Sequence, residues 1–261
     1  DQIGYSSTME EENQTRRKRG IYLLPNLFTT AAFFSGFYAI VAATNDKFEQ
    51  AAIAVLIAMI LDGIDGRVAR MTNTQSEFGA EYDSLADLAS FGLAPALVMY
   101  EWSLSSMRDI SWQMGKLGWL AAFIYAVAAA LRLARFNTKA SSTDKRYFQG
   151  LPSPSAAAVI IGMVWVCYDN DIAGADVAHL AWPLTVIVGV LMVSKVSYYS
   201  FKDIDFQNRV PFFVILIVVL IFVFFAIDPP KVLFTGFFLY TLSGPVIAVL
   251  RRLRKRSQRA E

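Results

Sequence analysis

Long apolar runs recur along the whole chain, separated by short polar stretches that carry most of the charges. A helix that crosses a membrane needs about 20 mostly apolar residues, because the hydrocarbon core is about 30 Å thick. The runs that meet or approach this length are residues 23–43, 50–71, 79–101, 116–136, 154–170, 177–196, 210–227 and 231–250. The sequence therefore predicts an all-α, polytopic integral-membrane bundle of about eight transmembrane helices.

Composition supports this fold class, because 55% of the residues are hydrophobic and the mean hydropathy is positive. We divide the chain into a polar tail with a basic cluster, residues 1–20, a membrane domain, residues 21–250, and a basic tail, residues 251–261. The basic tail can anchor the chain beside anionic lipid headgroups or recognise an anionic substrate. We favour the anchor.

The basic residues indicate how the bundle is oriented. With eight spans both termini lie on one side, and 20 of the 24 Lys and Arg residues then fall on that side. The other side holds only Lys47, Arg108, Lys116 and Lys231. Short loops rich in Lys and Arg stay in the cytoplasm, so both termini are predicted to be cytoplasmic. We expect a bacterial inner membrane.

Four aspartates lie inside the second and third predicted spans. Asp62 and Asp65 are three residues apart, and Asp83 and Asp87 are four apart. On a helix each spacing puts both carboxylates on one face. A charge at the bilayer centre costs about 2.5–3.5 kcal/mol on insertion scales, so these groups face one another, a polar cavity or a bound cation.

A divalent cation would remove the repulsion among these carboxylates. Hard oxygen ligands favour Mg²⁺, Mn²⁺ or Ca²⁺. One histidine, His179, and one cysteine, Cys167, leave no plausible zinc set. Two cations about 3.5–4 Å apart would bind a diphosphate and stabilise its leaving oxygen. We therefore expect two divalent cations, Mg²⁺ or Mn²⁺, and phosphoryl-group transfer.

Small residues and one arginine accompany the aspartates. Gly66, Ala69 and Gly79 leave room for a ligand, or for a neighbouring helix, to approach the backbone. Arg70 can pair with a phosphate or extend to the membrane surface as an anchor. Beside four aspartates we favour the phosphate contact.

These residues form a recognisable pattern. Asp62-x-x-Asp65-Gly66-x-x-Ala69-Arg70, eight residues, then Gly79-x-x-x-Asp83-x-x-x-Asp87 resembles the signature of the CDP-alcohol phosphotransferase family at every fixed position. Flanking segments resemble its phosphatidylserine synthase branch: Phe78-Gly79, Ser90-Phe91-Gly92, Arg132 to Asn137 and Gly150 to Pro154. The resemblance extends from Leu24 to about Lys202.

The resemblance implies roles for the matching positions. Asp62, Asp65 and Asp83 would be metal ligands, and Asp87 a metal ligand and the general base. The CDP-lipid would be contacted or accommodated by Asn26, Thr29, Asp62, Gly66, Ala69, Arg70, Ser76 and Gly79. For Asn26 and Thr29, a helix start at the membrane surface is an equally good interpretation.

The resemblance also implies transfer of a phosphatidyl group from CDP-diacylglycerol to L-serine, in a homodimer among membrane lipids, with no nucleic-acid partner. Serine carries a carboxylate, and Arg132 or Arg135 could bind it, with Asn137 completing the pocket. Both arginines could instead be topology anchors.

Two alternatives remain. Another acceptor such as glycerol phosphate, inositol phosphate or choline would use the same chemistry. A cation or proton transporter would also bury acidic residues, but no charged residues continue a path outward from the aspartates.

Overall fold

The computed structural model describes residues 25–72, 74, 76–139, 147–199, 220 and 223–257, and these residues are mostly helical. The first helix, Pro25–Ala43, is followed by α2, Phe48–Thr72. The later long helices are α6 (Trp112–Lys139), α7 (Ser153–Asp169), α8 (Ala178–Val193) and α10 (Pro229–Ser257). The prediction of a helical protein is confirmed.

The third predicted span is one continuous helical path with a change of winding inside it. It consists of α3 (Glu77–Asp87), the π-helical turn η1 (Leu88–Leu93) and α4 (Ala94–Trp102). Two short turns, η2 (Leu104–Ser106) and α5 (Met107–Ile110), lead into α6. Two strands that hydropathy did not predict, β1 (Tyr147–Gln149) and β2 (Ser197–Tyr199), pair antiparallel, with Phe148 opposite Tyr198.

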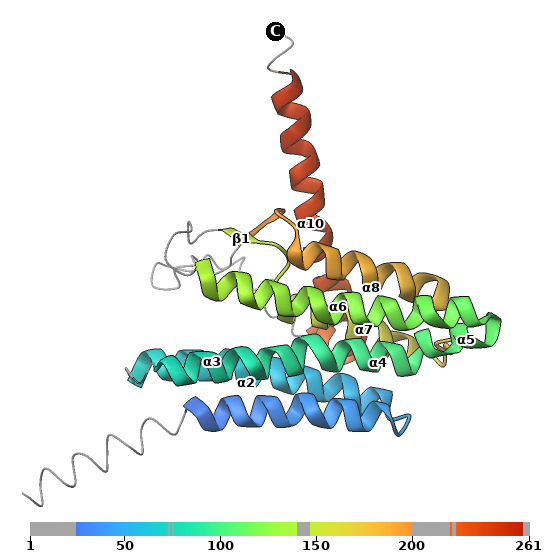
Figure 1. Ribbon diagram of the computed structural model, residues 1–261, viewed down its shortest axis with the longest axis horizontal. Coiled ribbons are helices and arrows are strands. Elements are labelled where there is room, and N and C mark those ends of the chain that lie inside the picture. The colour runs from blue at the N-terminus through green and yellow to red at the C-terminus, as the bar shows by residue number, and fades with distance from the viewer. Residues whose placement is uncertain are drawn as a thin grey trace, which may run out of the picture.

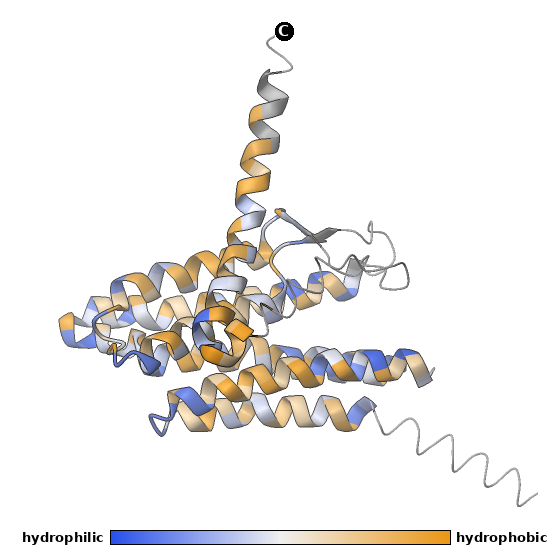
Figure 2. Cartoon of the chain, turned by 180° about the vertical axis from the view of Figure 1, so that it is seen from behind, coloured by the Kyte–Doolittle hydropathy of each residue, from blue (hydrophilic) through white to orange (hydrophobic). Residues whose placement is uncertain are grey.

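Most long helices share one direction. The first helix, α2, α3 to α4, α6 and α8 lie along one another, whereas α10 runs across them and its C-terminal half extends beyond the bundle (Figure 1). Hydrophilic residues concentrate at the helix ends and turns, and hydrophobic residues follow the helix bodies (Figure 2). This distribution fits helices whose middle sections lie in a membrane.

The membrane prediction is confirmed in part. Within the described residues, three helices are long and apolar enough to cross a membrane: Pro25–Ala43, Trp112–Thr138 and Pro229–Leu250. Helix α2 carries too many charged residues for that criterion, the third predicted span is divided into the short helices α3 and α4 by η1, and α7 and α8 are apolar but shorter. The seventh predicted span and residues 1–20 lie mainly or wholly outside the described residues. The number eight and the cytoplasmic termini stay predictions.

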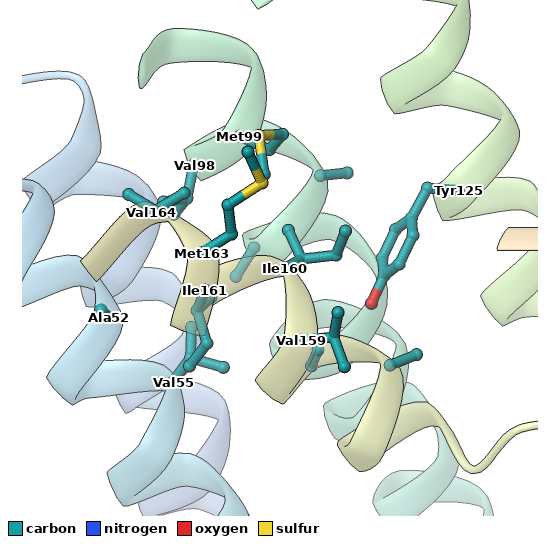
Figure 3. Close-up of a cluster of buried hydrophobic side chains, with 14 of the residues drawn as sticks. Ala52, Val55, Val98, Met99, Tyr125, Val159, Ile160, Ile161, Met163 and Val164 are labelled. Atoms are coloured by element: carbon teal, nitrogen blue, oxygen red, sulfur yellow. The ribbon is translucent and has the colours of Figure 1, made fainter. Parts of the chain in front are cut away.

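Helix α7 forms the centre of the core. Residues 156–165 are all buried, so this helix is enclosed on nearly every side. Figure 3 shows side chains of α7 beside Val55 of α2, Met99 of α4 and Tyr125 of α6. A helix that is apolar all round has to be covered by neighbours or by lipid. Here α7 holds the surrounding helices in register.

The π-helical turn η1 is held from two sides. The buried Ser90 hydroxyl donates to the Ala32 carbonyl of the first helix at 3.1 Å, and an added Cβ at Gly36 would lie 2.7 Å from the Ser90 Cα. On the other side, the buried Tyr125 hydroxyl of α6 donates to the Phe91 carbonyl at 3.0 Å. Such turns occur frequently at functional sites. This one directly follows Asp87, so these contacts fix the end of α3.

The close approach at Gly36 gives a stability prediction. Gly36→Ala forces a methyl group against the η1 backbone and should destabilise the fold by roughly 1–3 kcal/mol, as overpacked core substitutions do. The control is Gly236→Ala, where an added Cβ meets nothing within 4 Å. Thermal unfolding in detergent should show a lower midpoint for Gly36→Ala alone. Equal midpoints for both variants would contradict the packing described for η1.

Candidate active site

Three carboxylates from two helices meet in one group. Asp62 of α2 and Asp83 and Asp87 of α3 each offer an oxygen, and these oxygens all lie within 4.8 Å of one another. All three side chains are half-buried. The predicted helix faces are therefore confirmed for these three residues, which we call the aspartate trio.

Two acids of the trio are close partners. The Asp62 and Asp87 carboxyl groups are near enough for a hydrogen bond between them. A hydrogen bond of this kind requires a proton on one partner, because two ionised carboxylates can only accept. A cation bound between the two groups would take the place of that proton.

Asp65 lies beside the trio and has a different environment. It is 4% exposed and accepts a hydrogen bond from the Thr29 hydroxyl of the first helix at 2.7 Å. Its carboxylate interacts electrostatically with Asp62 and Asp83 but lies outside the group within 4.8 Å. The structure thus places all four predicted aspartates together, with three in the tightest group.

The predicted lipid-contact residues of α3 lie at its N-terminus. Ser76 caps the helix, since its hydroxyl accepts from the Gly79 amide at 3.0 Å. An added Cβ at Gly79 would lie 3.4 Å from the Asn26 side-chain oxygen. Asn26, Ser76 and Gly79 therefore surround one point where the first helix meets α3. The capping bond gives Ser76 a structural role as well.

The predicted small residues of α2 leave space near the trio. An added Cβ at Gly66 would meet only the Arg70 guanidinium tip, at 3.9 Å, and one at Gly63 would meet nothing within 4 Å. Arg70 is exposed and Ala69 is half-buried. Gly66 thus leaves the surface of α2 open beside Arg70, and its role in accommodating a ligand stays a prediction.

The three predicted acceptor residues have different surroundings. The Arg132 guanidinium of α6 interacts electrostatically with Asp87, and its Nη1 donates to the Ser153 hydroxyl at 2.9 Å. The Arg135 Nη1 instead donates to the Ser194 carbonyl at 3.5 Å. The exposed Asn137 amide donates to the Ser84 hydroxyl at 3.0 Å. Arg132 is thus within electrostatic range of Asp87, Arg135 contacts the end of α8, and Asn137 contacts the chain neighbour of Asp83.

Two residues near Arg132 have no role that the sequence predicts. Ser153 is the first residue of α7 and is 1% exposed, and Tyr240 of α10 interacts electrostatically with Arg132. The Gly150 to Pro154 segment pointed to Ser153 only as part of a resemblance. No feature of the sequence around Tyr240 predicts a functional role, because Tyr240 comes near Arg132 only when α10 packs on the bundle.

The donor set of the trio suits a hard divalent cation. Carboxylate oxygens are the ligands that Mg²⁺ and Mn²⁺ take in proteins. No histidine or cysteine belongs to the group found among the described residues. Half-buried like charges at this separation repel unless a proton or a cation lies among them. The arrangement can therefore hold a cation beside a phosphate-bearing ligand.

Comparisons with known proteins agree with this arrangement. The family model for CDP-alcohol phosphatidyltransferase matches residues 22–193, which is most of the chain and includes every aspartate of the site. The chain belongs to the CDP-alcohol phosphatidyltransferase family. Its relatives include the CDP-diacylglycerol–serine O-phosphatidyltransferase of Helicobacter pylori, 36% identical over 203 residues that cover 78% of this chain and 83% of the relative.

Two further relatives of this family carry the same name. The Mycobacterium tuberculosis protein is 40% identical over 156 residues, which cover 57% of this chain and 52% of that protein. The Methanocaldococcus jannaschii protein is 35% identical over 149 residues, which cover 57% of this chain and 63% of that protein. The family resemblance stated from the motif is thereby confirmed.

Cation binding by the trio can be measured directly. Asp62→Asn, Asp83→Asn and Asp87→Asn each remove a charged ligand, and each should weaken Mn²⁺ binding at least about tenfold to a hundredfold, the range seen even for residues that only support a ligand. Titration of the purified full chain, followed by the electron paramagnetic resonance signal of free Mn²⁺, gives the affinity.

The matched control is Asp109→Asn on α5, at the other end of the bundle from α3 (Figure 1). Asp65→Asn distinguishes a site of three carboxylates from the predicted site of four. Mn²⁺ affinity should fall in this variant only if Asp65 is a direct ligand. Wild-type affinity in all three trio variants would rule out the trio as the cation site.

Proposed function

We propose that this protein transfers a phosphatidyl group from CDP-diacylglycerol to L-serine, giving phosphatidylserine and CMP. The observation that carries the proposal is the aspartate trio, which lies inside the matched CDP-alcohol phosphatidyltransferase segment. The names of the relatives support CDP-diacylglycerol and serine as the two substrates.

Asp62, Asp83 and Asp87 would hold divalent cations, with Asp65 as the fourth predicted ligand. Bound Mg²⁺ or Mn²⁺ would neutralise the diphosphate and the departing CMP. The close approach of the Asp62 and Asp87 carboxyl oxygens supports this proposal, because two negative charges at that separation need a neutralising partner.

The chain's own residues would then bring the acceptor to the phosphate. The serine hydroxyl is a weak nucleophile at neutral pH, so a carboxylate has to take its proton as it attacks. We assign that step to Asp87. The serine oxygen forms a bond to the phosphorus that carries the diacylglycerol, the bond from that phosphorus to the CMP oxygen breaks, and the proton stays on Asp87.

The nucleotide and lipid would lie between the first helix and the α2 to α3 pair. Asn26, Gly79 and Ser76 surround one point there. The space at Gly66 lies next to Arg70, which would pair with phosphate, and Ala69 would accommodate the lipid on the same helix. Thr29 would act through Asp65, since its hydroxyl holds that carboxylate. We propose these positions as the CDP-lipid site.

The serine carboxylate would bind Arg132. The electrostatic interaction of Arg132 with Asp87 supports this choice. Serine is small, so the residue that binds its carboxylate has to lie near Asp87, which would take the proton from its hydroxyl. Arg135 donates to Ser194 and Asn137 donates to Ser84. We propose that these two residues contact serine as it enters the site and do not bind its carboxylate.

The distribution of Lys and Arg supports an active site that faces the cytosol, and we propose the bacterial inner membrane as its location. We further propose a homodimer, which the family resemblance supports. Light scattering of the detergent-solubilised chain would distinguish a dimer from a monomer.

The acceptor can be identified by CMP release. Purified full-length protein with CDP-diacylglycerol and Mn²⁺ or Mg²⁺ should release CMP with L-serine about 100-fold faster than with glycerol phosphate, inositol phosphate or choline, because a polar pocket rejects acceptors that leave its groups unpaired. Faster release with one of the other alcohols would keep the chemistry and change the substrate. No release with any acceptor would contradict the proposed function.

The proton-accepting role of Asp87 gives a second test. Asp87→Asn cannot take the serine proton, and kcat should fall by about 10² to 10⁴, the usual contribution of general base catalysis. The assay uses Mn²⁺ concentrations that saturate the variant, so that weakened cation binding does not account for the loss. Asp109→Asn should retain wild-type kcat. Near-normal turnover of Asp87→Asn would remove that residue from the mechanism.

A further inference from the structure

The corner of the bundle around Arg132 contains polar atoms without partners. In the described part of the chain only two buried side-chain polar atoms lack a hydrogen bond, the Arg132 Nε and the Thr241 hydroxyl. Buried donors are paired in most proteins, so each exception needs an explanation. Arg132 interacts electrostatically with Asp87 and with Tyr240 of α10. Its Nε is therefore an unpaired buried donor within electrostatic range of the aspartates.

Helix α10 is fixed to this region by close packing. Gly162 of α7 admits the backbone of α10, since an added Cβ there would lie 3.2 Å from the Phe234 Cα. Farther along, Gly244 receives the ring of Tyr198, which an added Cβ would overlap. The Tyr198 hydroxyl donates to the Thr241 carbonyl at 3.0 Å. The segment 234–244 is thus held in place by α7 and β2.

This packing brings Tyr240 within electrostatic range of Arg132. The Tyr240 ring packs on the buried Tyr198 ring with centroids 5.5 Å apart, and its phenol interacts electrostatically with the Arg132 guanidinium. Helix α10 and β2 lie outside residues 22–193, which the family model matches. The contact with Arg132 therefore comes from a part of the chain to which the family match assigns nothing.

We propose that Tyr240 is a specificity-determining residue that binds the acceptor carboxylate together with Arg132, and that Ser153 is a positioning residue that holds Arg132. The proposal rests on the proposed function, since it concerns the carboxylate of serine. The Arg132 Nη1 is engaged by Ser153, which leaves the buried Nε to donate to a carboxylate oxygen. A phenol both donates and accepts, so on acceptor binding Tyr240, which already has interacting partners, would direct its hydroxyl to the same carboxylate.

The test compares two acceptors that differ only in the carboxylate. L-serine and L-serine methyl ester both carry the attacking hydroxyl and the ammonium group, but the ester lacks the negative charge. The quantity measured is the ratio of kcat/KM for serine to kcat/KM for the ester, from CMP release by the full chain. Arg132→Lys keeps the charge but loses the fixed geometry of the guanidinium, and provides the reference for a damaged carboxylate site.

Tyr240→Phe and Ser153→Ala should each lower this ratio about tenfold, the size expected when one hydrogen bond to a charged group is lost. The loss should appear in the KM for serine, whereas the KM for CDP-diacylglycerol stays near the wild-type value. The matched control is Tyr198→Phe, which removes the hydroxyl from the other ring of the same pair. It should leave the ratio unchanged even if it lowers the unfolding temperature.

An unchanged ratio in Tyr240→Phe, or an equal fall in Tyr198→Phe, would overturn the proposal, since the second result would show that the ring pair acts only through packing. Failure of the proposed function has a different signature. In that case the wild-type protein itself releases no CMP with L-serine, before any variant is compared.

Discussion

The structure depends on the placement of four carboxylates inside an apolar bundle. Asp62, Asp65, Asp83 and Asp87 come from two helices, and three of them bring oxygens within 4.8 Å of one another. Such a group persists only if something offsets the mutual repulsion. The Thr29 hydroxyl at Asp65 and the electrostatic interaction of Arg132 with Asp87 each contribute. A divalent cation would offset the repulsion more completely and would prepare the site for a diphosphate.

The rest of the fold maintains that geometry. The buried helix α7 holds α2, α4 and α6 around one core, and its first residue, Ser153, contacts Arg132. The π-helical turn η1 sits between the first helix and α6, directly after Asp87. Side chains fixed by packing and by hydrogen bonds keep their orientation when substrates bind. The stability of the bundle and the precision of the site thus have the same source.

Features set by residues close together in the chain can be predicted from the sequence, whereas contacts between distant segments cannot. Spacings of three and four residues are enough to predict the aspartate faces, because helix geometry is local. They cannot predict that the Thr29 hydroxyl donates to Asp65. Nor can they predict the separate partners of the acceptor residues, which are Ser153 for Arg132, Ser194 for Arg135 and Ser84 for Asn137. Hydropathy located most helices but not η1, the β1 to β2 pair or the direction of α10, which depend on packing.

The most direct test is to locate the cation. Crystals of the full chain grown with Mn²⁺ and a non-reacting CDP-lipid analogue would show manganese by its anomalous scattering. The account predicts density between α2 and α3, about 2.0–2.6 Å from oxygens of Asp62, Asp83 and Asp87, the range for hard cations with oxygen ligands. Density elsewhere, with the three carboxylates turned into separate environments, would contradict it.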